Sequence, residues 1–297
     1  MPIPEAQLAT WAKQGSITQS ASTYQTIRRA LESEDSDFAD KSFDIFLQGS
    51  YGNDTNIYAD SDVDVVICLT SIFRYNLKKL SEVQETAYRA YVTPATYSFV
   101  EFKTAVIRHL EHSFGEQMVK VGDKAITVLA AGNRRKADVL VCYEYREYTA
   151  FILPSVNDFV KGIIFPTPNS EIINYPKEHS ANLTTKHQST NSMLKPMVRI
   201  LKNMRNRMID DGLLDEGVAP SYYLEGLFFN VPEAKYDTTS YGNTFVNGIN
   251  WITSEADAAK LVCANWQYYL LGELNVQWNE ANYKTFLEVL RKQWREW

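Results

Sequence analysis

The chain has 297 residues, of which 45% are hydrophobic and 22% charged, and its formal net charge is −6. These values are typical of a folded protein with one large domain or two closely packed ones, and they exclude a disordered chain. The negative charge argues against a protein that grips duplex DNA along its backbone, because such proteins neutralise phosphates with strong basic patches.

The distribution of residue types also argues against a membrane-spanning protein and against a secreted one. The sequence has no apolar run of about 18 residues, so we expect no membrane span. Its first residues lack the basic region and apolar run of a secretory signal. The three scattered cysteines, Cys68, Cys142 and Cys263, are better explained as reduced thiols than as disulfides. Together these features predict a cytoplasmic protein.

The first 69 residues predict a long helix and two strands. Apolar residues recur at helical spacing over residues 5–33, with a break near Gly15. Residues 43–48 form the first predicted strand and residues 62–69 the second. Side chains alternate between the two faces of a strand, so Asp62 and Asp64 are expected to face the same side.

The middle of the chain predicts two helices, two strands and an irregular connection. Ser98 and Glu101 form a capping box at the start of the second helix. Strands are expected over residues 125–129 and 137–145. Residues 146–190 contain four prolines and are expected to be an irregular region that crosses between lobes.

The last third predicts helices. One starts near Met193 with Pro196 in its first turn, another opens with Pro220 and Ser221 and runs through Phe229, and the last starts near Asn279. In the first of these, a cationic stripe (Lys195, Arg199 and Lys202) is expected on the face opposite an apolar one. The predicted fold class is therefore α+β, with a mixed lobe over residues 1–190, a helical lobe over residues 191–297, and a cleft between them.

Three aspartates are candidates for a metal site. Asp62 and Asp64 open an apolar strand, although aspartate is disfavoured inside strands, and Asp138 opens another. Carboxylate oxygens are the ligands that Mg²⁺ prefers, and two such ions can act together in phosphoryl transfer. The alternative interpretation is a set of solvated aspartates at strand starts.

A second group of residues is a candidate phosphate and base site. Gly49 allows close approach of the backbone to a phosphate, and Ser50 offers a hydroxyl and an amide. Lys202 and Ser221 are candidates for the triphosphate, and Tyr222 could stack on a base. The alternative is that these residues belong to turns, caps and the core.

The combined motifs resemble the cGAS/DncV-like nucleotidyltransferases (CD-NTases), over nearly the whole chain. The motifs that carry the resemblance are Gly49-Ser50, Asp62-x-Asp64, Asp138, Lys202 and Pro220-Ser221-Tyr222. The runs Leu47-Gln48-Gly49-Ser50-Tyr51, Asp60-Ser61-Asp62-Val63-Asp64-Val65-Val66 and Asn174-Tyr175-Pro176-Lys177 resemble the bacterial CdnE clade in particular.

The resemblance implies a polymerase-β-like core and synthesis of a cyclic dinucleotide from nucleoside triphosphates in CBASS anti-phage defence. It implies two Mg²⁺ ions, with Mn²⁺ as a substitute. Asp62 and Asp64 would hold both ions, and Asp138 would complete the one that activates the attacking hydroxyl. Gln48, Gly49 and Ser50 would clasp the donor phosphates, Lys202 and Ser221 the triphosphate, and Tyr222 the donor base.

Asn174 carries the expected base preference. In this clade an asparagine at the matching position accompanies pyrimidine use, and a carboxamide can pair with the O4 and N3–H of uracil. UTP is therefore one expected substrate. The product is expected to be cyclic di-UMP, another cyclic dipyrimidine or cyclic UMP-AMP. The alternative is that Asn174 is an ordinary loop residue.

The resemblance also bears on partners. The animal DNA sensor of this family has a zinc insertion and a basic DNA-binding surface, and this chain has neither pattern, so no duplex DNA activator is expected. We expect a monomer whose product is sensed by a downstream CBASS effector. Two alternatives are a transferase of the same fold that modifies an RNA end, a protein or a small molecule, and a nucleotide-binding module without catalysis.

Overall fold

The computed structural model describes residues 3–58 and 62–297. Asp60 and Ser61 of the sequence motif lie outside the described residues. The chain divides into two compact units. The sheet unit comprises residues 18–48 and 62–176, and the helical unit comprises residues 3–17, 49–58 and 177–297. The boundary expected near residue 190 stays a prediction.

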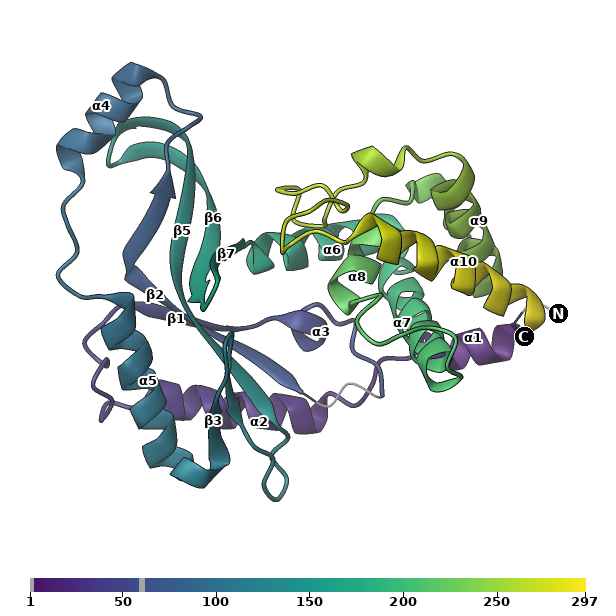
Figure 1. The fold of residues 1–297 in the computed structure, drawn as a ribbon, viewed down its shortest axis with the longest axis horizontal. Coiled ribbons are helices and arrows are strands. Elements are labelled where there is room, and N and C mark those ends of the chain that lie inside the picture. Colours follow the sequence, from purple (N-terminus) through teal and green to yellow (C-terminus); the bar gives the residue numbers. More distant parts are fainter. Residues whose placement is uncertain (1–2, 59–61) are drawn as a thin grey trace. The chain divides into compact units, whose positions relative to one another are not determined.

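The sheet unit is built on a mixed sheet, which has seven strands in the described part of the chain (Figure 1). Its order is β1-β2-β5-β4-β3, and β6 and β7 extend it from β5. The strands are β1 (Phe43–Leu47), β2 (Val63–Asn76), β3 (Val119–Val121), β4 (Ile126–Val128), β5 (Ala137–Leu153), β6 (Val156–Thr167) and β7 (Ser170–Asn174). The helices are α2 (Thr18–Leu31), α4 (Glu82–Tyr91), α5 (Phe99–Phe114) and the 3₁₀ turn η1 (Glu116–Met118).

The centre of the sheet is the parallel pair β2 and β5. Residues on both faces of β2 are buried, as expected for a central strand between parallel and antiparallel neighbours. Helices α2 and α5 pack near one end of this pair, and α4 packs on β5 (Figure 1). The expected end of β2 at residue 69 was too early, because a register shift between Leu69 and Phe73 lets the strand continue to Asn76.

Residues 146–190 are regular, so their interpretation as an irregular connection was wrong. The region contains the rest of β5, then β6, β7 and α6 (Pro176–Ser189). The prolines occupy positions that regular structure tolerates. Pro154 and Pro168 lie in turns, Pro166 lies near the end of β6, and Pro176 begins α6.

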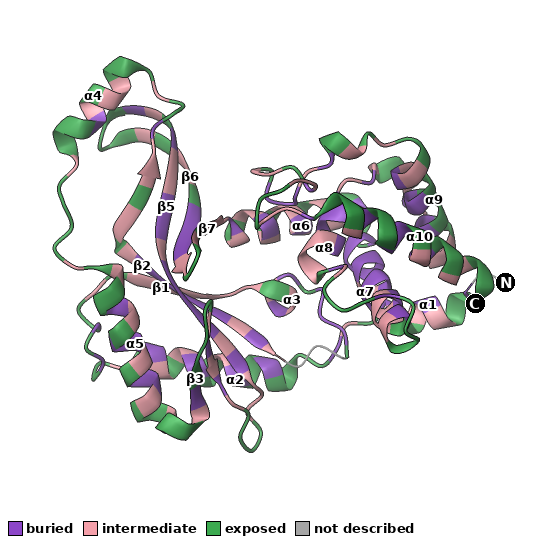
Figure 2. Ribbon diagram, in the orientation of Figure 1, coloured by how far each residue is buried: buried purple, intermediate pink, exposed green. Residues whose placement is uncertain are grey.

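The helical unit surrounds one long buried helix. Its elements are α1 (Glu5–Trp11), α3 (Gly49–Gly52), α6, α7 (Leu194–Asp210), α8 (Ser221–Phe229), η2 (Glu233–Lys235), α9 (Tyr241–Ser254), η3 (Ala258–Lys260) and α10 (Glu280–Glu296). Figure 2 shows α7 buried along most of its length. Its expected apolar stripe, from Met197 to Met208, is fully buried, and α1, α8, α9 and α10 pack on α7. Helix α9 and strand β3 had no counterpart among the expected elements.

The break expected at Gly15 is present between α1 and α2. A side chain at residue 15 would meet the backbone of the helical unit, because a Cβ there would lie 2.5 Å from Ile57 O. Gly15 therefore allows close packing of two backbone segments. The α+β class is confirmed. No helix in the described ranges combines the length and apolar character needed to cross a membrane.

Candidate active site

The backbone positions of the three predicted aspartates are neighbours at one end of the central strand pair. Asp64 on β2 lies opposite Asp138 on β5 in the parallel register, and Asp62 directly precedes β2. The starts of neighbouring parallel strands meet at the same edge of a sheet. The side chains of Asp62 and Asp138 are 40% and 25% exposed, so both can reach a solvent-borne ligand.

A lysine ammonium lies among these carboxylates. Lys136 Nζ is 2.6 Å from Asp62 Oδ2 and 3.5 Å from Asp138 Oδ2. The hydrogen bond to Asp62 raises the pKa of Lys136 above its ordinary value. Thr127 on β4 donates a hydrogen bond of 2.5 Å to Asp138 Oδ1 and fixes that carboxyl from the other side. The aspartates thus attract a cation, and Lys136 supplies one.

This arrangement fits a divalent ion in its donor chemistry. Carboxylate oxygens are hard ligands suited to Mg²⁺ or Mn²⁺. Across residues 3–58 and 62–297, no three His, Cys, Asp or Glu side chains converge into a metal-holding group. To bind a metal ion, the aspartate side chains would therefore have to turn toward one another, and Lys136 would have to move away from them.

The predicted phosphate turn is a short helix that glycine begins. Gly49, the first residue of α3, has φ +63°, a backbone conformation that residues with a side chain rarely adopt. Asn53 N–H donates to Gly49 O at 3.0 Å, and Thr55 N–H donates to Ser50 O at 2.9 Å. These bonds fold residues 49–55 into a compact loop within the helical unit. In the sheet unit, Gln48 N–H donates to Asp64 O at 3.0 Å.

Lys202 lies on α7, on the helix face that the sequence predicts to be cationic. Its side chain is fully buried, and Nζ donates to Thr55 O at 3.1 Å. Helix α7 is enclosed on the predicted cationic face as well, where Lys195 is also buried. Packing of residues 53–55 against α7 was not visible in the helical periodicity. The contact of Lys202 with a triphosphate stays a prediction.

Ser221 and Tyr222 are adjacent at the start of α8. Arg205 lies 3.4 Å from Ser221 Oγ through a guanidinium nitrogen. The Tyr222 ring stacks on the His179 ring, with centroids 4.7 Å apart and planes at 21°. Its hydroxyl accepts a hydrogen bond from Asn265 Nδ2 at 3.0 Å, and burial raises its pKa. The hydroxyl therefore stays protonated at neutral pH.

Asn174 is the last residue of β7. Its Oδ1 accepts a hydrogen bond from Tyr175 N–H at 2.8 Å, which orients the carboxamide. Its backbone pairs with Ile163 on β6. Gly162 is needed beside it, because a Cβ at residue 162 would lie 2.9 Å from Asn174 O. The carboxamide is therefore held by its own strand end.

Two buried polar residues of the helical unit, close to Tyr222, were missed from the sequence. Glu225 and His179 are each 2% exposed, and His179 Nε2 lies 2.7 Å from Glu225 Oε2. Their partners are far apart in the chain, so spacing gave no signal. One signal was available, because Glu225 is a charged residue inside the apolar run Leu224 to Phe229, and buried charges need partners.

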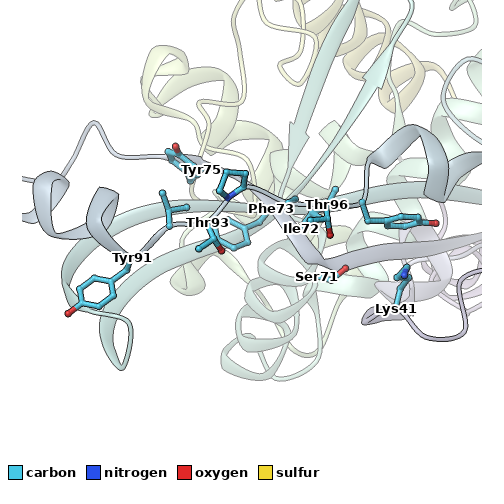
Figure 3. Close-up of a pocket in the computed structure, with 12 residues that line it drawn as sticks. Lys41, Ser71, Ile72, Phe73, Tyr75, Tyr91, Thr93 and Thr96 are labelled. Atoms are coloured by element: carbon cyan, nitrogen blue, oxygen red, sulfur yellow. The ribbon is translucent and has the colours of Figure 1, made fainter.

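A cavity of about 770 Å³ lies elsewhere in the sheet unit (Figure 3). It is lined by part of β2, the end of α4 and the following segment, with Lys41 at one end and Tyr91 at the other. None of the three aspartates lines it. It is therefore separate from the carboxylate cluster.

Comparison with known proteins gives full-length relatives. The chain is 38% identical to the cyclic UMP-AMP synthase of Rhodothermus marinus, covering 100% of this chain and 99% of the relative. It is 30% identical to the cyclic dipyrimidine nucleotide synthase CdnE of Legionella pneumophila, covering 95% of each.

The fold comparison agrees. The structure of the Rhodothermus marinus CdnE c-UMP-AMP synthase with Apcpp and Upnpp matches with a TM-score of 0.89 and 36% identity, covering 100% of this chain and 98% of the other. Residues 181–295 match the family model of the cGAS/DncV-like nucleotidyltransferase C-terminal helical domain. The chain is therefore a nucleotidyltransferase of polymerase-β-like fold, and it belongs to the CdnE clade of the cGAS/DncV-like family.

Proposed function

We propose that the protein joins two nucleoside triphosphates, one of them UTP, into a cyclic dinucleotide. The observation that carries this proposal is the register of β2 and β5, which puts Asp64 opposite Asp138 with Asp62 beside them. The names of the relatives from Rhodothermus marinus and Legionella pneumophila support a cyclic product that contains a pyrimidine. The first relative favours cyclic UMP-AMP as the product to look for.

We assign Asp62, Asp64 and Asp138 as ligands of two Mg²⁺ ions, which Mn²⁺ could replace. When bound, such ions neutralise phosphate charge and hold the attacking and leaving oxygens in line. Asp62 and Asp64 would contribute to both ions, and Asp138 to the one on the acceptor side. Thr127 would keep Asp138 oriented, since it already donates to that carboxyl.

In the helical unit, Gly49 and Ser50 would bind the donor phosphates through backbone N–H groups and the Ser50 hydroxyl. Gln48, which precedes them in the chain, would position this turn, and Ser221 and Lys202 would support the triphosphate. Tyr222 would contact the donor base. In each of two rounds, a ribose hydroxyl oxygen bonds to the α-phosphorus, the bond to pyrophosphate breaks, and the hydroxyl proton is released. The second round closes the ring.

Asn174 would select the pyrimidine. A carboxamide has both a donor and an acceptor, which match N3–H and O4 of uracil. Because Oδ1 already accepts from Tyr175 N–H, the amide of Asn174 is presented in a fixed orientation. The cyclic product would act in the cytoplasm as a signal for a CBASS effector.

The test is product formation by the parent chain and a carboxylate variant. Both are incubated with the four ribonucleoside triphosphates and Mg²⁺, treated with phosphatase, and analysed by mass spectrometry. We expect a phosphatase-resistant dinucleotide that contains uridine. Asp62→Asn/Asp64→Asn should reduce it at least about 100-fold, because charge stabilisation in the transition state is lost.

The matched control is Asp35→Asn/Asp123→Asn, two exposed aspartates of the sheet unit, which should behave like the parent. Unchanged product from Asp62→Asn/Asp64→Asn would remove the carboxylates from the mechanism. Transfer of radiolabelled nucleotide to RNA, protein or a small molecule, without a free cyclic product, would instead favour the alternative transferase of the same fold.

A further inference from the structure

One buried carboxyl group joins three separate segments of the helical unit. Glu225 on α8 accepts hydrogen bonds from Asn53 Nδ2 at 2.9 Å and from Thr55 Oγ1 at 2.5 Å. His179 on α6 lies 2.7 Å from the same carboxyl through Nε2. All four side chains are buried, between 0% and 6% exposed. We name Asn53, Thr55, His179 and Glu225 the Glu225 network.

The network is tied to the Gly49–Ser50 turn by the backbone. Asn53 N–H donates to Gly49 O, and Thr55 N–H donates to Ser50 O. Each of these two residues therefore bonds to the turn through its main chain and to Glu225 through its side chain. A displacement of the carboxyl would leave buried donors without a partner, which costs more than an ordinary hydrogen bond contributes.

Asp54, the residue between Asn53 and Thr55, is fixed by contacts with α7. Asp54 has φ +54°, an uncommon conformation for a residue with a side chain. Lys195 Nζ donates to Asp54 Oδ2 at 3.0 Å, and a guanidinium nitrogen of Arg199 donates to Asp54 O at 2.7 Å. Three consecutive loop residues are thus fixed by charged side chains of α7 and α8. The polar contacts of these three residues, buried at Asn53 and Thr55 and exposed at Asp54, specify one loop geometry.

The Glu225 network also contacts Tyr222, through His179. Glu225 and Tyr222 are three residues apart on α8 and lie on the same side of the helix. His179 contacts both, since its Nε2 lies beside the Glu225 carboxyl and its ring stacks on the Tyr222 ring. His179 Nδ1 is buried and has no hydrogen-bond partner among the described residues. The ring is therefore oriented by Glu225 on one side and by stacking on the other.

We propose that Glu225 is a positioning residue for nucleotide binding, which sets the phosphate turn through Thr55 and Asn53 and the base-contacting Tyr222 through His179. The inference rests on the proposed function, in which Ser50 and Tyr222 bind the donor nucleotide. Ion pairs and polar clusters in a core add little stability compared with apolar packing, so the presence of this one is better explained by the geometry that it imposes. One carboxyl then couples the phosphate and base contacts.

The first test removes the hydrogen bond that links Glu225 to the Gly49–Ser50 turn through Thr55. Thr55→Val deletes the hydroxyl that binds Glu225 and keeps the side-chain volume. Calorimetric titration with inorganic tripolyphosphate and with a nonhydrolysable UTP analogue should show a Kd raised about tenfold for both ligands, the effect of one lost hydrogen bond to a carboxyl. Thr55→Ser, which keeps the hydroxyl, should restore both affinities.

The second test removes the contact that links Glu225 to Tyr222 through His179. His179→Phe keeps a ring beside Tyr222 and removes the contact with Glu225. The Kd for the UTP analogue should rise several-fold, while the Kd for tripolyphosphate stays that of the parent. Thr185→Val and His112→Phe, at exposed positions, are the matched controls. Unfolding midpoints are measured for every variant, and His179→Phe carries the test if Thr55→Val does not fold.

Two results would overturn the positioning role. One is an unchanged tripolyphosphate Kd for Thr55→Val, and the other is equal loss of both ligands in His179→Phe. A merely structural role would give one of these. Failure of the proposed function is distinguishable, because the parent chain would then bind neither ligand, whereas failure of the network leaves the parent binding both.

Discussion

Lys136 lies where a divalent cation would be expected, with its ammonium 2.6 Å from Asp62. A cation held by two carboxylates competes with any other cation for them. Lys136→Met should therefore bind Mn²⁺ several-fold more tightly than the parent in the absence of nucleotide, since a competing charge is removed. Electron paramagnetic resonance of free Mn²⁺ measures this directly.

Lys124→Met, at an exposed position of the same unit, is the control for loss of a positive charge. If Lys136→Met binds Mn²⁺ as the parent does, the ammonium and the metal occupy separate places. Weaker binding would mean that Lys136 orders the carboxylates for the metal.

The proposed role of Asn174 in base selection can be tested with a single substitution. Asn174→Ser should lower the use of UTP relative to ATP about 5–10-fold, because serine cannot supply a paired donor and acceptor to uracil. Mass spectrometry of products from equimolar UTP and ATP gives the ratio. Asn133→Ser, at an exposed turn, should leave it unchanged. An unaltered ratio in Asn174→Ser would remove this residue from base selection.

The residues that sequence patterns could predict are those with a local signal. Asp62 and Asp64 disturb an apolar strand, and Gly49 precedes a serine at a turn, so each is conspicuous within a few positions. Glu225 and Thr55 are 170 residues apart, and their contact exists only after α8 packs beside the loop. The burial of Lys202 has the same origin. Pairings of this range depend on tertiary packing that a periodicity analysis does not contain.

The sequence predicted strands and helices well where one face of the element is apolar and the other is polar. The capping box of Ser98 and Glu101 and the apolar face of α7 were confirmed. The hairpin of β5 and β6 was missed because prolines at its turns were given more weight than the alternating aromatic and β-branched residues between them. Pro166 is tolerated near the end of β6, where it pairs with Glu171 near the start of β7.

The junction of α6 and α7 contains a titratable contact. His187 Nδ1 accepts a hydrogen bond from Lys195 N–H at 3.3 Å. Burial, and then the charges of Lys195 and Arg199, lower the pKa of His187 from 6.5 to about 4. The unfolded chain therefore binds a proton between pH 6.5 and pH 4 that the folded chain does not bind.

Acid should accordingly destabilise the fold through this residue. The free energy of unfolding is expected to fall as pH drops from 6.5 to 4, with about 2 kcal/mol of the loss due to His187 after allowance for solvent screening. Urea denaturation across this range checks it. His187→Gln should flatten the dependence, and His112→Gln, an exposed histidine, should not. Equal slopes for both variants would contradict the assignment.

The helical unit draws on distant parts of the chain. Leu8 on α1 is fully buried in its core, and Glu5 accepts hydrogen bonds from the N–H groups of Tyr241 and Gly242 at the start of α9. Trp11 packs edge-on against Trp297, with ring centroids 5.2 Å apart. The N-terminal helix thus completes a core formed mostly by the last 121 residues, 177–297.

Leu8→Ala should lower the free energy of unfolding by about 2–5 kcal/mol, because it removes apolar burial and leaves a cavity. Chemical denaturation measures the loss. Ile17→Ala is the control within the same unit, since Ile17 is 54% exposed and should cost little. A small effect of Leu8→Ala would mean that α1 is dispensable for this core.

This composite core constrains how such a protein can be recombined. Exchange of residues 177–297 with those of a relative, at one breakpoint, would separate α7 and α9 from their native α1 and α7 from its native loop 53–55. An exchange that carries residues 3–17 and 49–58 as well would transfer the packing partners together. Stable folding of a hybrid synthase should therefore require that three separate stretches of the gene come from the same parent, and a designer would need to move all three.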